Sequence, residues 1–359
     1  MKPLKLIAAN DTFGALTATI QMLQGSQALF ITPPEVNGLM PGVHGLPDEV
    51  AEEVALIVES SGSTGTPKRI ELSANSLLAS ANASADYLGG HGQWLLALPI
   101  NYIAGINVLV RSVVADTQPV MMNTQLPFTA EGFSRAALLM TAERRYTSLV
   151  PLQLSKLAAA AQVDPILHAQ LKRFDAILVG GQLPDMDLVN RLRGEGIKIV
   201  VSYGMAETAG GCVYDGNPLQ GVDVKIESGL IAIAGPTLAN GLGDWFVTQD
   251  LGDVISGRLE VLGRADRVII SGGVKVSLES VEQFAAELPG VIEVAAISIK
   301  SSFGESVAIV YSGSPEVSFA ALADLSIAAK PAKVFRVEKL PRLLSGKPDL
   351  MALQAIANQ

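Results

Sequence analysis

Short apolar, β-branched runs alternate with longer amphipathic segments through the first two thirds of the chain, and this alternation limits the fold more than any other feature. Buried strands of a parallel sheet have such runs, and the helices that connect them have the longer segments. The predicted strands are Val54–Val58, Leu95–Leu98, Val120–Asn123, Ser148–Val150, Ala176–Val179 and Ile197–Ser202, and the predicted helices are Ser73–Tyr87, Thr129–Arg144, Leu152–Ala161 and Pro184–Arg193. The pattern predicts an α/β fold.

The pattern changes after Gly221 to short strands separated by glycines, which is typical of antiparallel sheet. These strands are expected at Val224–Ile226, Leu230–Ala234, Trp245–Val247 and Arg258–Leu262. A polar break at Gly263–Arg267 follows, and beyond it the chain has its own β-α-β cycle, with strands at Val268–Ile270, Val294–Lys300 and Ser306–Tyr311 and a helix at Ser277–Leu288. We therefore predict two domains: residues 1–265, a large domain of packed sheets and helices with a β-rich end, and residues 266–359, a small α+β C-terminal domain.

Composition excludes several classes of protein. The 359 residues carry 26 Lys and Arg against 35 Asp and Glu, a net charge of −9, which argues against nucleic acid or an anionic membrane as the main partner. One cysteine, Cys212, excludes an internal disulfide, and three histidines leave little for a zinc site.

No segment of the sequence reads as a membrane span or a secretory signal. The longest apolar stretch, Leu95–Val110, is interrupted by Pro99 and Gly105 and is better interpreted as strand, loop and helix. The apolar run at the start ends at Asn10, which is too short for a signal peptide. We expect a cytoplasmic protein without membrane insertion.

A segment rich in glycine and hydroxyl groups follows the predicted strand Val54–Val58 and ends in lysine. Glycines let backbone N–H groups turn toward an anion, hydroxyls add donors, and a lysine adds a charge, so the segment suits a phosphate. It is not the P-loop of nucleotide hydrolases, because Arg69–Leu72 reads as a returning strand and the next helix begins later, after Ser73 as its N-cap. Its residues are Ser61, Gly62, Ser63, Thr64, Gly65, Thr66, Pro67 and Lys68.

This segment resembles the signature loop of the adenylate-forming superfamily, which includes acyl-CoA synthetases, peptide-synthetase adenylation domains and luciferases. Further motifs similar to those of the superfamily follow in the same order, at Tyr203–Thr208, Thr248–Gly252, Gly263–Asp266, Ser271–Val276 and Ser345–Pro348. Ala206 and Gln249 depart from the usual residues, and fewer residues than usual precede the loop, so we expect the first part of the large domain to be reduced. The resemblance implies ATP, Mg²⁺ and CoA as ligands.

The resemblance also implies roles for the residues that match each motif. Lys347, Glu207, Thr64 and Lys68 would be catalytic, Glu207 would hold the metal, and Asp266 would be the hinge of the small domain. Tyr203 would stack on adenine, Asp250 would bind the ribose, and the Lys275 loop would approach the CoA channel. The residues expected to bind the nucleotide and CoA are Ser61, Gly62, Ser63, Thr64, Gly65, Thr66, Lys68, Gly181, Ser202, Tyr203, Gly204, Thr208, Asp250, Arg264 and Lys275.

Within the superfamily, several strings resemble the short form of o-succinylbenzoate–CoA ligases of menaquinone biosynthesis. The strings are Leu98–Ser112, Thr147–Leu154, Leu178–Gly181 and Glu207–Gly216. The resemblance implies an acyl pocket formed by Tyr102, Ile103, Gly105, Met205 and Gly210, with Tyr102 in place of the family's usual histidine. A substrate with two carboxylates needs a polar or cationic partner for the one that is not activated, and the candidates are Arg111, Lys156 and Gln153.

Three alternative functions stay open at this point. The chain could be a synthetase for another aromatic or medium-chain acid, which would share every motif. It could be a stand-alone adenylation enzyme that serves a carrier protein, or a non-catalytic nucleotide-binding remnant, although a remnant would be expected to lose Glu207 or Lys347. Members of the superfamily are often dimeric, which makes a homodimer a partner to consider, and Cys212 is expected to be structural.

Overall fold

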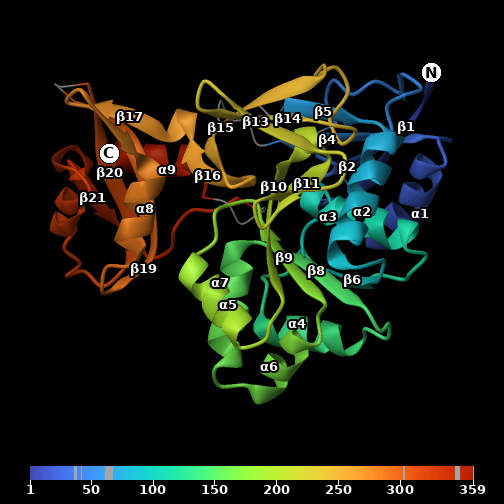
Figure 1. Ribbon diagram of the computed structural model, residues 1–359, viewed down its shortest axis with the longest axis horizontal. Helices are drawn as coiled ribbons and strands as arrows, with labels where there is room; N and C mark the ends of the chain where they lie inside the picture. The colour runs from blue at the N-terminus through green and yellow to red at the C-terminus, as the bar shows by residue number, and fades with distance from the viewer. Residues whose placement is uncertain (36–38, 42, 61–67, 302–303, 344–347, 359) are drawn as a thin grey trace. The chain divides into compact units, whose positions relative to one another are not determined.

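The chain forms two compact units in a computed structural model that describes residues 1–35, 39–41, 43–60, 68–301, 304–343 and 348–358 (Figure 1). The first unit comprises Met1–Val224, Ile233–Phe246 and Ser256–Leu259, and the second comprises Lys225–Ala232, Val247–Ile255 and Glu260–Gln359. The division therefore runs through the four-stranded sheet that residues 223–264 form, and a domain boundary at Asp266 stays a prediction.

A seven-stranded sheet is the largest element of the first unit. Its order is β12-β11-β10-β9-β8-β6-β7, and the strands β7, β6, β8, β9 and β10 run parallel while β11 and β12 are antiparallel to their neighbours. The alternating pattern thus folds as α/β, as predicted. The bounds are β6 Gln93–Leu96, β7 Val120–Met121, β8 Arg145–Leu149, β9 Ala176–Gly180, β10 Ile199–Met205, β11 Gly210–Tyr214 and β12 Asn217–Pro218.

Helices cover both faces of this sheet. Leu95 of β6 belongs to a buried cluster that includes Phe133, Leu157 and Leu192 from the helices on one face, whereas the neighbouring Trp94 lies against Arg111 of α3. Successive side chains of a strand point to opposite faces, so α3 lies on the other face. The helices of the first face are α4 Ala130–Leu138, α5 Pro151–Ala161, α6 Pro165–Lys172 and α7 Met186–Gly194, and those beside α3 Ile103–Val114 include α2 Ala74–Leu88.

The ends of two helices test the sequence predictions. Ser73 caps α2 by accepting a hydrogen bond from the Ser76 amide at 3.0 Å, as predicted. The predicted helix Thr129–Arg144 is wrong in its second half, because α4 ends at Leu138. The amides of Thr141 and Ala142 donate instead to Gln93 Oε1, at 2.8 and 3.1 Å, and this contact directs the chain into β8.

A five-stranded sheet, with order β3-β1-β2-β4-β5, carries the predicted phosphate loop. The loop joins β4 to β5, which are antiparallel, so the predicted returning strand is confirmed, while residues 61–67 lie outside the described residues. Our sequence analysis identified none of the elements of the first 35 residues. The bounds are β1 Lys2–Ala8, α1 Thr12–Leu23, β2 Ala28–Thr32, β3 Glu49–Val50, β4 Leu56–Ser60 and β5 Lys68–Leu72.

A four-stranded sheet with the order β13-β14-β15-β16 follows, and a separate five-stranded sheet forms the C-terminal part. In that last sheet the order is β18-β17-β20-β19, β21 pairs with β20, and the predicted helix begins after Ser277, which caps it. The bounds are β13 Asp223–Glu227, β14 Leu230–Ala234, β15 Trp245–Ile255, β16 Arg258–Arg264, β17 Val268–Ser271, β18 Val274–Ser277, α8 Leu278–Ala286, β19 Val291–Ser301, β20 Gly304–Gly313, β21 Lys333–Arg336 and α9 Leu350–Ala357.

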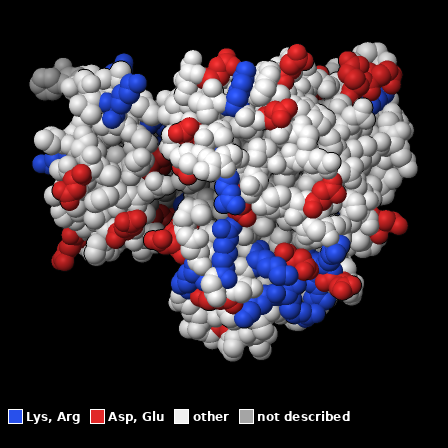
Figure 2. All heavy atoms as spheres, in the orientation of Figure 1, with Lys and Arg blue, Asp and Glu red and all other residues white. Residues whose placement is uncertain are grey.

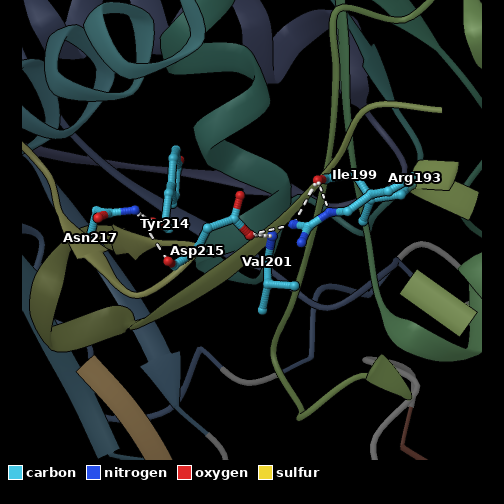
Figure 3. A network of polar contacts seen from close by, with 6 residues as sticks. All are labelled: Arg193, Ile199, Val201, Tyr214, Asp215 and Asn217. Atoms are coloured by element: carbon cyan, nitrogen blue, oxygen red, sulfur yellow. Dashed lines mark hydrogen bonds and ion pairs between the residues drawn. The ribbon is translucent and has the colours of Figure 1, made fainter. Parts of the chain in front are cut away.

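An ionic network ties α7 to the edge of the seven-stranded sheet (Figure 3). Arg193 donates to the Ile199 carbonyl through Nε at 3.0 Å and lies 2.5 Å from Asp215 Oδ1, which also accepts from the Val201 amide at 2.9 Å. Asp215 adopts φ +48° in the turn between β11 and β12, a conformation that aspartate tolerates better than most residues. The network fixes this turn at the amino end of β10.

The apolar stretch Leu95–Val110 folds as the end of β6, a loop and part of α3, as expected. Across the part of the chain that the structure describes, no helix is both long and apolar enough to span a bilayer.

Candidate active site

The parallel strands of the seven-stranded sheet bring several predicted site residues to one edge. In open α/β sheets, ligands bind where the carboxyl ends of the strands meet. Tyr102 follows β6 and is the N-cap of α3, Gly181 follows β9, and the remaining residues form the end of β10. The last group is Ser202, Tyr203, Gly204 and Met205.

Glu207 and Lys68 face each other beside this edge. Glu207 lies in a short 3₁₀ helix, Ala206–Thr208, directly after β10, and its carboxylate is 4.0 Å from Nζ of Lys68, the first residue of β5. The two side chains are 15% and 62% exposed, so both can meet a solvent-borne ligand.

The donor set around Glu207 fits a magnesium ion that arrives with a nucleotide. Among the residues with a described placement, no group of three or more His, Cys, Asp and Glu side chains could hold a metal. Mg²⁺ in nucleotide sites is commonly bound by one or two carboxylates, phosphate oxygens and water. A single carboxylate next to a lysine therefore suits a metal that the phosphates help to hold.

Thr208 is turned into its own loop. Its side chain is fully buried, its hydroxyl donates to the Gly210 carbonyl at 2.7 Å, and it accepts from the Met205 amide at 3.0 Å. In this geometry Thr208 shapes the loop after Glu207. The nucleotide contact predicted for it stays a prediction.

Two of the predicted acyl-pocket residues meet between α3 and β11. A Cβ at Gly210 would lie 3.7 Å from Ile103 Cγ1 and would overlap the amide of Asn107. Gly105 is needed for a different reason, because a Cβ there would overlap the Pro99 carbonyl. Asn107, which the sequence analysis missed, therefore stands beside the expected pocket.

Two polar layers connect α2 and α3 to the segment from Ala209 to Tyr214. We call Ser80, Asn107 and the Ala209 carbonyl the loop layer, and Ser84, Arg111 and Tyr214 the arginine layer. In the loop layer, Ser80 Oγ and Asn107 Nδ2 donate to the Ala209 carbonyl at 3.0 and 2.9 Å.

In the arginine layer, Arg111 Nη2 donates to Ser84 Oγ at 3.2 Å and to the Tyr214 hydroxyl at 3.1 Å, and these two hydroxyls lie 2.8 Å apart. The members of the two layers are four residues apart on both helices, which places them on one helix face. In the sequence, the four-residue spacing of Ser76, Ser80 and Ser84 indicates a polar face on this helix. It does not indicate which residues these serines contact.

The second unit holds three of the predicted nucleotide and hinge residues together. Arg264 Nη1 lies 3.5 Å from Asp250 Oδ1, and Arg264 donates to both carboxylate oxygens of Asp266, at 2.8 and 2.7 Å. These hydrogen bonds lower the pKa of Asp266 and raise that of Arg264. Lys275 is exposed on β18.

Two groups of predicted residues lie outside the described residues: the phosphate-loop residues Ser61, Gly62, Ser63, Thr64, Gly65 and Thr66, and the predicted catalytic Lys347. Cys212 is fully buried, and burial raises the pKa of its thiol to about 12. The thiol is therefore uncharged at neutral pH and unsuited to nucleophilic catalysis.

The family model described as AMP-binding enzyme matches residues 14–241 of this chain. This span includes the phosphate loop, the whole seven-stranded sheet and Glu207. The chain belongs to the AMP-binding enzyme family.

Two relatives give the comparison more detail. The chain is 38% identical over 377 residues to a protein named probable 2-succinylbenzoate–CoA ligase from Mycobacterium tuberculosis, and the match covers 98% of this chain and 97% of the relative. It is 27% identical over 307 residues to the 2-succinylbenzoate–CoA ligase of Escherichia coli, covering 79% of this chain and 60% of that protein.

Solved structures resemble the fold. The o-succinylbenzoate CoA synthetase of Bacillus subtilis in complex with its acyl-adenylate intermediate aligns with a TM-score of 0.79 at 21% identity, covering 98% of this chain and 88% of that one. The same enzyme with ATP and magnesium aligns with a TM-score of 0.74 at 22% identity, covering 97% and 88%. At this level of identity the likeness supports the adenylate-forming fold.

Proposed function

We propose that this chain is an ATP-dependent CoA ligase that converts o-succinylbenzoate to o-succinylbenzoyl-CoA through an acyl-AMP intermediate, as a step of menaquinone biosynthesis. The near full-length similarity to a probable 2-succinylbenzoate–CoA ligase supports the activity. The ordered motifs support the reaction class.

The buried Arg111 is the structural observation that favours a substrate with two carboxylates. Its side chain is 6% exposed, and its Nε is buried without a hydrogen-bond partner. The ion pairs found among the described residues do not include it, and its guanidinium carbon lies 4.8 Å from the centre of the Trp94 ring. A buried charge without a counter-charge is unfavourable, and a substrate carboxylate would offset it.

The two other candidates for this role have different surroundings. Gln153 is used within the protein, because its Nε2 donates to the Ala97 carbonyl at 2.9 Å and its Oε1 accepts from the Val150 amide at 3.1 Å. Lys156 is exposed on α5. Arg111 lies one helical turn beyond Asn107 on α3, so we assign it to the carboxylate that is not activated.

The first half-reaction would form the adenylate. The other carboxylate attacks the α-phosphorus of ATP, the bond to the β-phosphate breaks, and pyrophosphate leaves. We assign the leaving phosphates to the loop Ser61–Lys68, the metal to Glu207, and the developing charge on the α-phosphate to Lys347. These groups act by positioning and electrostatic stabilisation.

The second half-reaction would transfer the acyl group. The small domain rotates at Asp266, which withdraws Lys347 and brings the Lys275 loop toward the CoA channel. The CoA thiol loses its proton and attacks the acyl carbon, and AMP leaves with the bonding electrons. No cysteine of the protein takes part.

Thioester detection by mass spectrometry tests this proposal. The protein is incubated with ATP, Mg²⁺, CoA and either o-succinylbenzoate or a panel of benzoates and fatty acids. A strong preference for o-succinylbenzoate would support the assignment and show that Tyr102 is accepted in the pocket. Turnover of another acid would refute the substrate, and pyrophosphate release without any thioester would point to a carrier-protein acceptor.

A further inference from the structure

Ala209 has an unfavourable backbone conformation in the loop that follows Glu207. Its φ is +50° and its ψ is 34°, in the left-handed region, and the residue is fully buried. Within the described ranges, the other non-glycine residues with positive φ are Asp116, Asp215, Ser228 and Ser256, which have polar side chains. Alanine has no polar side chain that could stabilise this conformation, so the surroundings of Ala209 must impose it.

The loop layer supplies this constraint. The Ala209 carbonyl accepts hydrogen bonds from Ser80 of α2 and Asn107 of α3, and its amide donates to the Ala206 carbonyl at 3.1 Å. Ser80 and Asn107 are 1% and 3% exposed, so water does not compete for these bonds. Two neighbouring helices that are distant from the loop in sequence therefore hold the same carbonyl group.

This peptide group separates the two halves of the expected reaction site. Two residues before it, Glu207 stands 4.0 Å from Lys68, where the metal and phosphates are expected. One residue after it, Gly210 packs against the Asn107 amide and beside Ile103, where the acyl group is expected. A rotation of the Ala209 peptide would change the distance between these two subsites.

We propose that Asn107, together with Ser80, is a positioning residue that holds the Ala209 peptide and thereby aligns the substrate carboxylate with the α-phosphate. Neither side chain touches a reacting atom. The chemistry of this inference rests on the proposed function, while the conformational part does not. Loss of the Asn107 donor should lower kcat for adenylation and leave the binding of each substrate nearly unchanged.

Kinetics of ATP–pyrophosphate exchange test the alignment. We expect Asn107→Ala to lower kcat by about 10- to 100-fold, with both KM values within about threefold of those of the unchanged protein. Ser80→Ala should have a smaller effect of the same kind. Ser76→Ala is the matched control, because Ser76 is equally buried on α2 but, within the described part of the chain, its hydroxyl donates to the carbonyl of the neighbouring Ser73, and the variant should keep full activity.

A rescue variant separates positioning from general damage. Glycine adopts the left-handed conformation without strain, so Ala209→Gly in the Asn107→Ala background should recover part of the lost kcat. Hydrogen exchange measured by mass spectrometry gives a second readout without turnover: Asn107→Ala should speed exchange in the segment 206–211, and Ser76→Ala should not.

Several outcomes of these experiments would refute the positioning role of Asn107. A kcat unchanged in Asn107→Ala, a loss confined to KM for the acid, or unchanged exchange in the segment 206–211 would each refute the positioning role. Equal losses in Ser76→Ala and Ser80→Ala would refute it as well, since they would indicate a general effect on α2. If the unchanged protein activates no acid, the proposed function fails, and the hydrogen-exchange result still decides whether Asn107 holds the loop.

Discussion

Replacement of Arg111 by methionine should have opposite effects on activity and on stability. Arg111 is buried in the arginine layer, and its Nε has no partner within the described chain. Methionine has a similar length and no charge. The Ser84 and Tyr214 hydroxyls lie 2.8 Å apart and can remain bonded to each other, so the substitution leaves neither of them unsatisfied.

The expected changes in activity and stability follow from comparing the enzyme with o-succinylbenzoate bound and the free enzyme. With o-succinylbenzoate bound, the variant loses the hydrogen bonds between a guanidinium and a carboxylate, each contributing about 1.5–3 kcal/mol. Loss of one or two such bonds corresponds to a fall in kcat/KM on the order of 100-fold or more. In the free enzyme the variant removes a buried charge that has no ion-pair partner among the described residues. Replacement of buried ion pairs by apolar side chains of similar volume is neutral or stabilising by about 1–4 kcal/mol in other proteins, and removal of this buried charge should act in the same direction. Loss of the contact with Trp94 offsets about 1–2 kcal/mol of that gain.

Two assays with matched substrates check this prediction. Pyrophosphate release should be measured with o-succinylbenzoate and with analogues that lack one carboxylate, and the variant should be impaired with the diacid much more than with an analogue that lacks the carboxylate held by Arg111. Thermal unfolding should show a melting temperature equal to or above that of the unchanged protein. Equal losses with diacid and monoacids, or a variant less stable by several kcal/mol, would show that Arg111 is a structural residue instead.

Four further predictions follow from the site. Lys347→Ala should abolish adenylate formation but leave thioester formation from supplied acyl-AMP largely intact; equal losses would refute two orientations of the small domain. Asp250→Ala should lower the affinity for ATP far more than the affinity for CoA in binding titrations, and an equal loss of both affinities would refute the assignment of Asp250 to the ribose. Because hydrogen bonds from Arg264 lower the pKa of Asp266 below its ordinary value of 3.8, the ionised carboxylate stabilises the fold above that pH and this contribution is lost as the pH falls. Asp266→Asn should therefore be less stable than the unchanged protein in denaturant titrations at pH 7, with a difference that shrinks below pH 3.8; a constant difference would contradict this. With its pKa near 12, Cys212 should resist iodoacetamide in the native protein at pH 8, and Cys212→Ala should keep kcat; rapid labelling or lost activity would contradict the structural assignment.

The alternation of short apolar runs and amphipathic segments was sufficient to predict the α/β architecture. Each run is long enough for one buried strand, and local signals such as the Ser73 cap lie next to the helix that they start. The end of α4 could not be predicted, because it depends on amides of Thr141 and Ala142 that bond to Gln93, far away in the sequence. Tertiary contacts of this kind leave no local pattern.

The residues of the candidate site also divide into those that a local sequence motif indicates and those that only tertiary contacts identify. Motif residues such as Glu207 and Asp250 could be assigned roles from the sequence because they stand in short recognisable strings, and these roles stay predictions. Arg111 was one of three equal candidates in the sequence, and only its burial without a counter-charge distinguishes it. Asn107 gave no signal at all, since its importance depends on the conformation of Ala209, in a loop far away in the sequence.

The loop layer and the arginine layer stand one turn apart on the same faces of α2 and α3, a spacing of about 5.4 Å along a helix. If the acyl group binds as proposed, this arrangement makes the depth of its site adjustable in steps. A designer could replace the arginine layer by larger apolar side chains to select shorter acids, or by smaller ones to admit longer acids, while the layer above continues to hold the loop. The same separation would let substrate range diverge among descendants of this protein without a change in the adenylation chemistry.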